Sequence, residues 1–253
     1  MIHSFLIIGQ SNMAGRGNLS EASPLLTNGG KMKVLRNGRW QIMYRPVNPD
    51  RPFSGTCLAE SFAKAYSDDH PEVDVGIIPC ADGGTSLDQW QPDGLLFDNA
   101  LSCAKLAKRT SYLKGILWHQ GEADCADELY PLYLEKITRI MSRLRKELGD
   151  KNLPIIVGGL GDFLKECDSD PSLANYSLVN NALMDFVKQT PHTAFASAEG
   201  LESNPDNLHF NHESLQKFGI RYYNEYKKIE AKSCVCDEEC KLNDTFRTKM
   251  ELL

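Results

Sequence analysis

The chain has 253 residues, of which 42% are hydrophobic, and a formal net charge of -6 at pH 7. This length suits a single domain with a substantial core, and the interspersed charges, without a basic stripe, exclude a typical nucleic-acid-binding protein. No stretch reaches the roughly 20 apolar residues of a membrane-spanning helix, and the first residues lack the cationic start of a signal peptide. We therefore expect a cytoplasmic protein that binds no nucleic acid and no membrane, and whose partner is small or neutral.

Short apolar strands alternate with helical patterns along the chain. The predicted strands are residues 5–8, 73–79, 112–119 and 153–158, with a weaker one at 193–198. Apolar residues at helical spacing predict helices at 56–66, 95–108, 127–148, 172–188 and 213–228. Strands that are apolar on both faces and separated by helices are typical of right-handed βαβ units. The predicted fold class is therefore α/β, a three-layer α/β/α sandwich with a central parallel sheet of about five strands.

One segment inside the predicted domain does not fit this alternation. Residues 22–54 are rich in Gly, Pro, Asn and Arg, and we expect them to cross the surface, with a hairpin at Asn37-Gly38. We assign residues 1–232 to one domain and residues 233–253 to a polar C-terminal tail.

The eight cysteines fall into two groups. Five are scattered through predicted elements without paired spacing, which favours reduced thiols: Cys57, Cys80, Cys103, Cys125 and Cys167. The tail holds the other three, fewer than the four ligands of a structural zinc site: Cys234, Cys236 and Cys240. We expect an exposed or locally disulfide-linked tail and no metal.

Polar, glycine-bearing loops follow four of the predicted strands. They are residues 9–12, 80–86, 120–124 and 199–211. Because ligands bind beyond the carboxyl ends of the strands in an open parallel sheet, we expect these loops to meet on one rim.

Together, the four loops hold the parts of an acyl-transfer site. Ser11, on a tight turn after Gly9, can present its hydroxyl to a carbonyl as a nucleophile. His209 can take the proton, and Asp206 lies close enough in the chain to orient the imidazole. An N–H of the Gly83-Gly84 pair and the Gln120 amide can stabilise the oxyanion.

Each of these residues also has a purely structural interpretation. Ser11 can cap a short helix, Asp206 and His209 can be turn and surface residues, and the glycine pair can be a simple turn. Gln120 and Glu122 can bond buried loop amides. The combination favours catalysis, because four separate loops supply four complementary roles.

The same loops resemble a known family. "GQSNMAGRG", "DGGTSLDQW", "WHQGEAD" and "DNLHF" are similar, in the same order, to the conserved blocks of the SGNH (GDSL-like) hydrolases. The resemblance is to the branch of the sialate O-acetylesterases and the family 6 carbohydrate esterases, which includes acetylxylan esterases. The blocks span residues 9 to 210. A lipase-type G-x-S-x-G turn is absent, since Met13 replaces its second glycine; a flavodoxin-like SGNH fold is implied instead.

The resemblance implies a role for each matching residue. Ser11 would be the nucleophile, and its N–H would join the oxyanion hole with the Gly83 N–H and the Gln120 amide. Gly84 is the alternative donor, because one sequence does not settle the register of a glycine pair. His209 would be the general base and Asp206 its orienting carboxylate. The implied reaction is removal of O-acetyl groups from a carbohydrate through an acetyl-enzyme, without a cofactor.

The resemblance leaves the substrate contacts open. Arg16, Trp90 and Trp40 are candidate sugar-contacting residues, although a tryptophan at these positions can equally pack under a loop. Glu122 and Asp124 are expected to fix loops, for example by pairing with Arg16.

Two other functions remain as alternatives. A glycosidase would use Glu122 with Asp124 or Asp206, but Glu122 and Asp124 are too close in one loop for the usual separation across a sugar. A carbohydrate-binding protein without catalysis would have the same fold, although no triad member is missing here.

Overall fold

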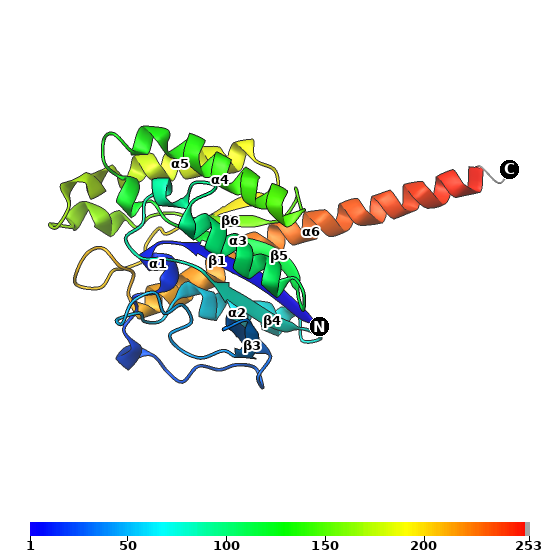
Figure 1. The fold of residues 1–253 in the computed structure, drawn as a ribbon, viewed down its shortest axis with the longest axis horizontal. Helices are drawn as coiled ribbons and strands as arrows, with labels where there is room; N and C mark the ends of the chain where they lie inside the picture. Colours follow the sequence, from blue (N-terminus) through cyan, green and yellow to red (C-terminus); the bar gives the residue numbers. More distant parts are fainter. Residues whose placement is uncertain (251–253) are drawn as a thin grey trace.

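The computed structural model describes residues 1–250, with side chains through residue 231. A seven-stranded sheet lies at the centre in the order β3-β2-β4-β1-β5-β6-β7 (Figure 1). All neighbouring strands are parallel except the β2–β3 pair. The strands are β1 (Ile2–Gly9), β2 (Met32–Arg36), β3 (Arg39–Ile42), β4 (Asp74–Pro79), β5 (Tyr112–His119), β6 (Ile155–Gly158) and β7 (Thr193–Ala196).

Helices cover both faces of the sheet, so the architecture is the predicted three-layer sandwich (Figure 1). One hydrophobic cluster joins the sheet to α2 and α6, and another joins the opposite face to α3, α4 and α5. The helices are α1 (Ser11–Ala14), α2 (Leu58–Asp69), α3 (Leu95–Ala107), α4 (Tyr133–Leu148), α5 (Tyr176–Gln189) and α6 (His212–Met250).

The central strand β1 shows why the sheet is buried on both sides. Its side chains alternate between the faces: Phe5 and Ile7 enter the first cluster, whereas Leu6 and Ile8 enter the second, and all four are fully buried. An apolar run of this kind suits a strand covered by helices on both faces. The end of β1 therefore lies at the middle of the sheet's carboxyl rim.

The sheet is wider than the predicted five strands. The five predicted strands correspond to β1, β4, β5, β6 and β7, and the expected hairpin at Asn37-Gly38 connects β2 to β3. The hairpin joins the sheet because β2 pairs in parallel with β4, adding two edge strands. This pairing depends on a tertiary contact that local sequence patterns do not report.

The C-terminal helix crosses the expected domain boundary. Helix α6 continues past residue 232 and extends away from the sandwich (Figure 1). Cys234, Cys236 and Cys240, on which the tail prediction depends, lie outside the residues whose side chains the structure describes. The five other cysteines are free thiols. Among the described residues, no helix combines the length and apolar character needed to cross a membrane.

Candidate active site

A pocket of about 460 Å³ opens at the carboxyl rim of the sheet. Its walls come from the segments that follow β1, β4 and β5, together with the 199–211 loop that precedes α6. Residues 51 and 53 add one wall and residues 169–173 add another. Four loops predicted to meet therefore do share one pocket.

The pocket brings together the three residues expected to form a triad. The Ser11 Oγ lies 3.0 Å from His209 Nε2, and His209 Nδ1 lies 2.7 Å from Asp206 Oδ2. These distances are within hydrogen-bonding range. If Nδ1 carries the proton and donates it to Asp206, the unprotonated Nε2 faces the serine hydroxyl, which is the tautomer that a general base needs.

Asp206 orients both the imidazole and the loop that carries it. While Oδ2 contacts the ring, Oδ1 accepts hydrogen bonds from the N–H groups of Leu208 and His209, each at 3.0 Å. Partial burial alone would raise the pKa of Asp206, but these N–H groups and the His209 ring hold the pKa below its usual value. The carboxylate therefore stays ionised beside the imidazole at neutral pH.

Asn12, the residue after the serine, fixes the histidine loop from the other side. Its Nδ2 donates to the Leu208 carbonyl at 3.1 Å, and its Oδ1 accepts from the Phe210 N–H at 3.0 Å. These two bonds hold the residues immediately before and after His209 in place. Sequence reasoning assigned Asn12 no role, because its partners lie almost 200 positions away.

A buried cluster beneath the pocket anchors Asn12 in turn. Glu122 Oε1 accepts from Asn12 Nδ2 and lies 3.3 Å from His119 Nε2. Burial opposes ionisation of Glu122, but His119 and Asn12 outweigh it and lower the pKa of the carboxyl. Glu122 thus acts on the loops, as expected, but its partners are Asn12 and His119 and not Arg16.

The serine turn requires a glycine at position 9. Gly9 has φ of 128°, and a Cβ there would lie 2.0 Å from the His119 carbonyl oxygen. Only glycine tolerates this conformation and this close approach of β5. The close packing of Gly9 against β5 lets the backbone turn sharply from β1 into Ser11.

Arg16 lines the pocket but is held in an ion pair that sequence reasoning did not find. Its guanidinium binds the buried Asp50 carboxylate through two bonds of 2.7 and 3.0 Å. Asp50 also accepts from Ser54 Oγ at 2.7 Å and from the Gly83 N–H at 2.8 Å. Burial alone would raise the pKa of Asp50, but bonds from Arg16, Ser54 and Gly83 lower it.

The Asp50 contact changes the expected oxyanion hole. The Gly83 N–H, the first choice as a donor, points to Asp50. Gly84 also lines the pocket, has φ of 77°, and its N–H donates no hydrogen bond within the part of the chain that the structure describes. The Ser11 N–H is equally free at the start of α1, where helical N–H groups lack partners.

Gln120 does not face the pocket. It is fully buried, and its Nε2 donates to the Thr85 carbonyl at 3.1 Å and to Asp124 Oδ2 at 2.5 Å. Burial raises the pKa of Asp124, although the Leu87 N–H and Gln120 oppose the shift. In this structure the Gln120 amide connects two loops and is not available to an oxyanion.

The two tryptophans considered as sugar contacts lie elsewhere. Trp90 is 1% exposed, donates to Thr85 Oγ1 and packs edge-to-face on Trp118, so it supports a loop from below. Trp40 donates to Thr110, just before β5, at the opposite end of the sheet from Ser11. Both tryptophan side chains therefore pack against other parts of the protein and do not line the Ser11 pocket.

The aromatic residue at the pocket is Phe53. It is 70% exposed, lines the pocket, and lies 5.2 Å from the Arg16 guanidinium. It belongs to the 22–54 surface segment, whose path over the site no local pattern predicted. An exposed aromatic face beside a pocket is a suitable platform for a sugar ring.

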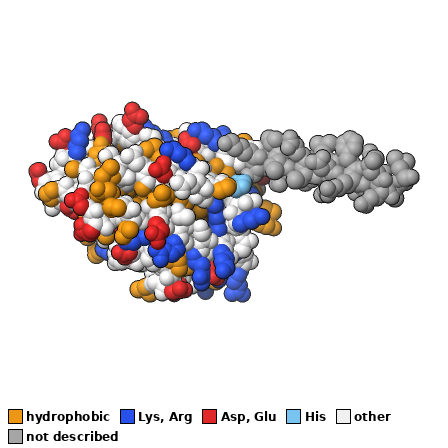
Figure 2. All heavy atoms as spheres, turned by 90° about the horizontal axis from the view of Figure 1, so that it is seen from above, with side chains coloured by type: hydrophobic (Ala, Val, Ile, Leu, Met, Phe, Trp, Pro, Cys, Tyr) orange, Lys and Arg blue, Asp and Glu red, His pale blue; other side chains and the backbone are white. Residues whose placement is uncertain are grey.

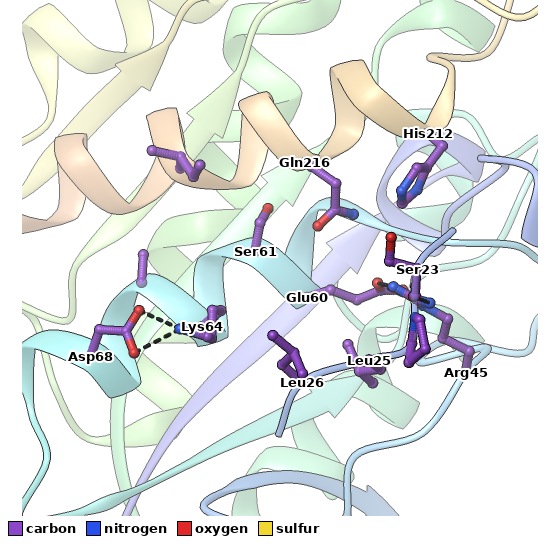
Figure 3. A pocket seen from close by; sticks show the side chains of 13 residues that line it. Ser23, Leu25, Leu26, Arg45, Glu60, Ser61, Lys64, Asp68, His212 and Gln216 are labelled. Atoms are coloured by element: carbon purple, nitrogen blue, oxygen red, sulfur yellow. Dashed lines mark hydrogen bonds and ion pairs between the residues drawn. The ribbon is translucent and has the colours of Figure 1, made fainter. Parts of the chain in front are cut away.

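A second cavity, of about 350 Å³, lies between α2, α6 and residues 23–26 (Figure 3). It contains the Arg45–Glu60 ion pair, and the Ser61 hydroxyl donates to the Leu58 carbonyl. His212 there contacts Thr56, a fully buried residue. Among the described residues that line this cavity, no accessible hydroxyl is paired with an imidazole, unlike at the Ser11 pocket.

A family model and a known protein both match most of this chain. The family model described as "Carbohydrate esterase, sialic acid-specific acetylesterase" matches residues 1–228. The probable carbohydrate esterase At4g34215 of Arabidopsis thaliana is 26% identical over 246 residues, covering 85% of this chain and 86% of that protein.

Solved structures share the fold. The X-ray structure of the same Arabidopsis thaliana protein superposes with a TM-score of 0.80 at 24% identity, covering 89% of this chain and 98% of that one. NanS gives a TM-score of 0.70 at 15% identity, with 91% and 98% covered. XAC1771, a carbohydrate acetylesterase from Xanthomonas citri, gives 0.64 at 20% identity, with 90% and 56% covered.

Proposed function

Since this chain belongs to the carbohydrate esterase, sialic acid-specific acetylesterase family, we propose that it removes O-acetyl groups from carbohydrates through an acetyl-enzyme on Ser11. The observation that carries this proposal is the continuous hydrogen-bonded chain from Ser11 through His209 to Asp206 at the pocket wall. Such a chain activates a serine hydroxyl, which at its ordinary pKa is a weak nucleophile.

In the first step, Ser11 Oγ attacks the acetyl carbonyl while His209 Nε2 takes the hydroxyl proton. Asp206 stabilises the imidazolium that forms and keeps its orientation. The Ser11 and Gly84 N–H groups, both free and both at the pocket, are suited to the negative oxygen of the tetrahedral intermediate. His209 then protonates the departing sugar hydroxyl, leaving the acetyl group on Ser11.

In the second step, water attacks the acetyl-enzyme. His209 removes a proton from the water, and the same N–H groups stabilise the second tetrahedral intermediate. Collapse releases acetate and returns the proton to Ser11. No step requires a metal or organic cofactor.

The substrate that suits the pocket is a neutral acetylated sugar. Phe53 offers an aromatic face, and both arginines of the pocket are neutralised: Arg16 by Asp50 and Arg51 by Asp82, at 2.8 Å. Asp170 adds an exposed carboxylate without an ion-pair partner in the described structure. Among the described residues that line the pocket, no cation is left unpaired for an anionic sugar.

The test is acetate release from p-nitrophenyl acetate and acetylated xylo-oligosaccharides by wild type, Ser11→Ala and His209→Ala. We expect both variants to lose activity by about 10⁴-fold or more, with thermal unfolding like that of wild type. Activity retained in Ser11→Ala would disprove the serine mechanism. An inactive wild type that still binds the sugar would instead support a binding protein.

A further inference from the structure

Two free cysteines lie together where α3 covers the sheet. Cys80 is the first residue after β4 and belongs to the hydrophobic cluster on that face, and Cys103 in α3 packs against the same cluster. The two side chains are hydrogen-bonded to each other. Because a disulfide can form only where two sulfurs already lie close together, this contact meets the first geometric condition for a bond between them.

The two thiols differ in their access to solvent. Cys80 is 7% exposed, whereas Cys103 is only partly buried. Cys103 Sγ also lies 3.9 Å from Oδ1 of Asn99, an exposed residue one turn earlier in α3. A dissolved oxidant can therefore reach Cys103 more readily than Cys80.

The contact between the thiols also makes Cys103 the more acidic of the two. A thiolate at Cys103 accepts the S–H of Cys80, and this bond lowers the pKa of Cys103 to about 7, although burial opposes the shift. The same bond, together with burial, raises the pKa of Cys80. At neutral pH Cys103 therefore supplies thiolate, the form of cysteine that attacks oxidants.

The other described cysteines lack this combination. Cys57 and Cys125 are fully buried, and burial raises the pKa of both thiols. Cys167 is 6% exposed, and its Sγ contacts oxygen atoms instead of a second sulfur. Within residues 1–231, the contact between two thiols, the partial exposure and the lowered pKa therefore occur together at Cys80 and Cys103.

We propose that Cys103 and Cys80 form a modification site, at which a hydroperoxide converts the two thiols into a reversible disulfide. An accessible thiolate beside a second thiol is the usual arrangement of a reversibly oxidised cysteine. The disulfide joins α3 covalently to the segment after β4, four residues before Gly84. This inference does not depend on the proposed esterase function.

With hydrogen peroxide, the reaction takes place in two steps. First, the Cys103 thiolate attacks one peroxide oxygen; the O–O bond breaks, Cys103 becomes a sulfenic acid, and the departing hydroxide takes up a proton to give water. Second, the Cys80 sulfur attacks the sulfenic sulfur; the S–S bond forms, the S–O bond breaks, and the hydroxide leaves as water with the Cys80 proton. The two sulfurs lose two electrons, which the peroxide accepts. Dithiothreitol reverses the change by thiol–disulfide exchange.

The test is peptide mapping of the full chain after oxidation. The protein is reduced, freed of reductant and treated with hydrogen peroxide, and the remaining thiols are blocked with iodoacetamide before digestion without reductant. Chymotrypsin is suitable because it cuts after Trp90 and Phe97, whereas no Lys or Arg separates Cys80 from Cys103 for trypsin. We expect mass spectrometry to find these two cysteines in one disulfide-linked pair of peptides, which dithiothreitol abolishes.

Serine variants separate the roles of the two thiols. In Cys80→Ser the sulfenic acid has no partner thiol, so dimedone, which traps sulfenic acids, should label Cys103 at least about tenfold faster than Cys125. In Cys103→Ser no disulfide should form at Cys80. The control is Cys167→Ser, which removes a buried thiol that contacts no other sulfur and should form the Cys80–Cys103 disulfide as wild type does. Thermal unfolding of each variant identifies effects that arise from misfolding.

The wild-type peptide map decides the proposal even if a serine variant unfolds. Both thiols still alkylated after peroxide treatment would overturn it, and so would a disulfide that joins Cys103 to a cysteine of residues 233–253 in place of Cys80. In folded Cys80→Ser, dimedone labelling no faster at Cys103 than at Cys125 would overturn it as well. Because each of these measurements is a covalent change in mass, none depends on whether the protein hydrolyses an ester.

Discussion

At the scale of single residues, Asp206 combines two tasks that a mutation can separate. One oxygen orients the His209 ring, while the other accepts the N–H groups of Leu208 and His209. In Asp206→Asn, the amide oxygen can still accept the backbone bonds, but the amide group cannot stabilise the imidazolium by charge. We expect kcat to fall by about 10⁴-fold with little loss of thermal stability. Steady-state kinetics and thermal unfolding together would check this, and a variant with nearly wild-type kcat would contradict it.

The residues that could be predicted from sequence are those with local partners. Asp206 and His209 are such a pair, in one short loop. Ser11, whose partner His209 lies 198 positions away, was instead indicated by its place just after the apolar strand β1. The predicted donors Gly83 and Gln120 are different, because the structure gives their N–H groups to Asp50 and Asp124. The Asp50 contact comes from a surface segment whose path depends on tertiary packing.

At the scale of elements, Asp50 joins three segments: its own, the one after α1 through Arg16, and the one after β4 through Gly83. Asp50→Asn leaves the Arg16 guanidinium buried without its counter-ion, so the free energy of unfolding should fall by about 3 kcal/mol at pH 7. Because the folded pKa of Asp50 lies below its usual 3.8, the carboxylate stabilises the protein above that pH. The stabilisation is lost as the pH falls through the lowered folded value.

Urea unfolding of wild type and Asp50→Asn between pH 7 and pH 3 measures this dependence. The difference in unfolding free energy should be constant near neutrality and shrink below about pH 4. The exposed Asp168→Asn is the control, since it removes one carboxylate from the surface. A difference that persists unchanged at the lowest pH would show that the effect does not come from ionised Asp50.

Elements with strong local patterns were predicted well. The strand at 112–119 has the predicted bounds, and β1 extends the predicted 5–8 run to Ile2–Gly9. The helix predicted at 127–148 begins only at Tyr133, because a 3₁₀ turn at Tyr130–Leu132 precedes it. Strands β2 and β3 became part of the sheet only through pairing with β4, which residue spacing alone does not encode.

At the scale of the whole molecule, acidic residues outnumber basic ones, 34 to 28. On the face shown in Figure 2, Asp and Glu are more frequent toward the left end and Lys and Arg toward the lower right, with hydrophobic side chains between them; the net charge is -6. The positive charges at the pocket are also balanced, because Arg16 and Arg51 are each paired with a carboxylate. Neither the long-range field nor the pocket should attract an anionic sugar.

This charge balance predicts substrate preference. We expect kcat/KM for an acetylated xylo-oligosaccharide to exceed that for an O-acetylated sialic acid by at least about tenfold at low ionic strength, because like charges at a binding site are costly. Added salt should bring the ratio of the two kcat/KM values closer to one, because the ions screen the repulsion of the anionic sugar. Competition between the two substrates in one reaction gives the ratio directly, and an equal or higher value for the sialic acid would contradict a neutral-sugar pocket.

The central claim is the acetyl-enzyme on Ser11, and the most direct measurement is peptide mass spectrometry after rapid acid quenching during turnover of p-nitrophenyl acetate. We predict an acetyl group on the peptide that contains Ser11, and no acetylated peptide in Ser11→Ala. Steady acetate release by wild type with Ser11 never acetylated, or with the acetyl group on another residue, would contradict the account.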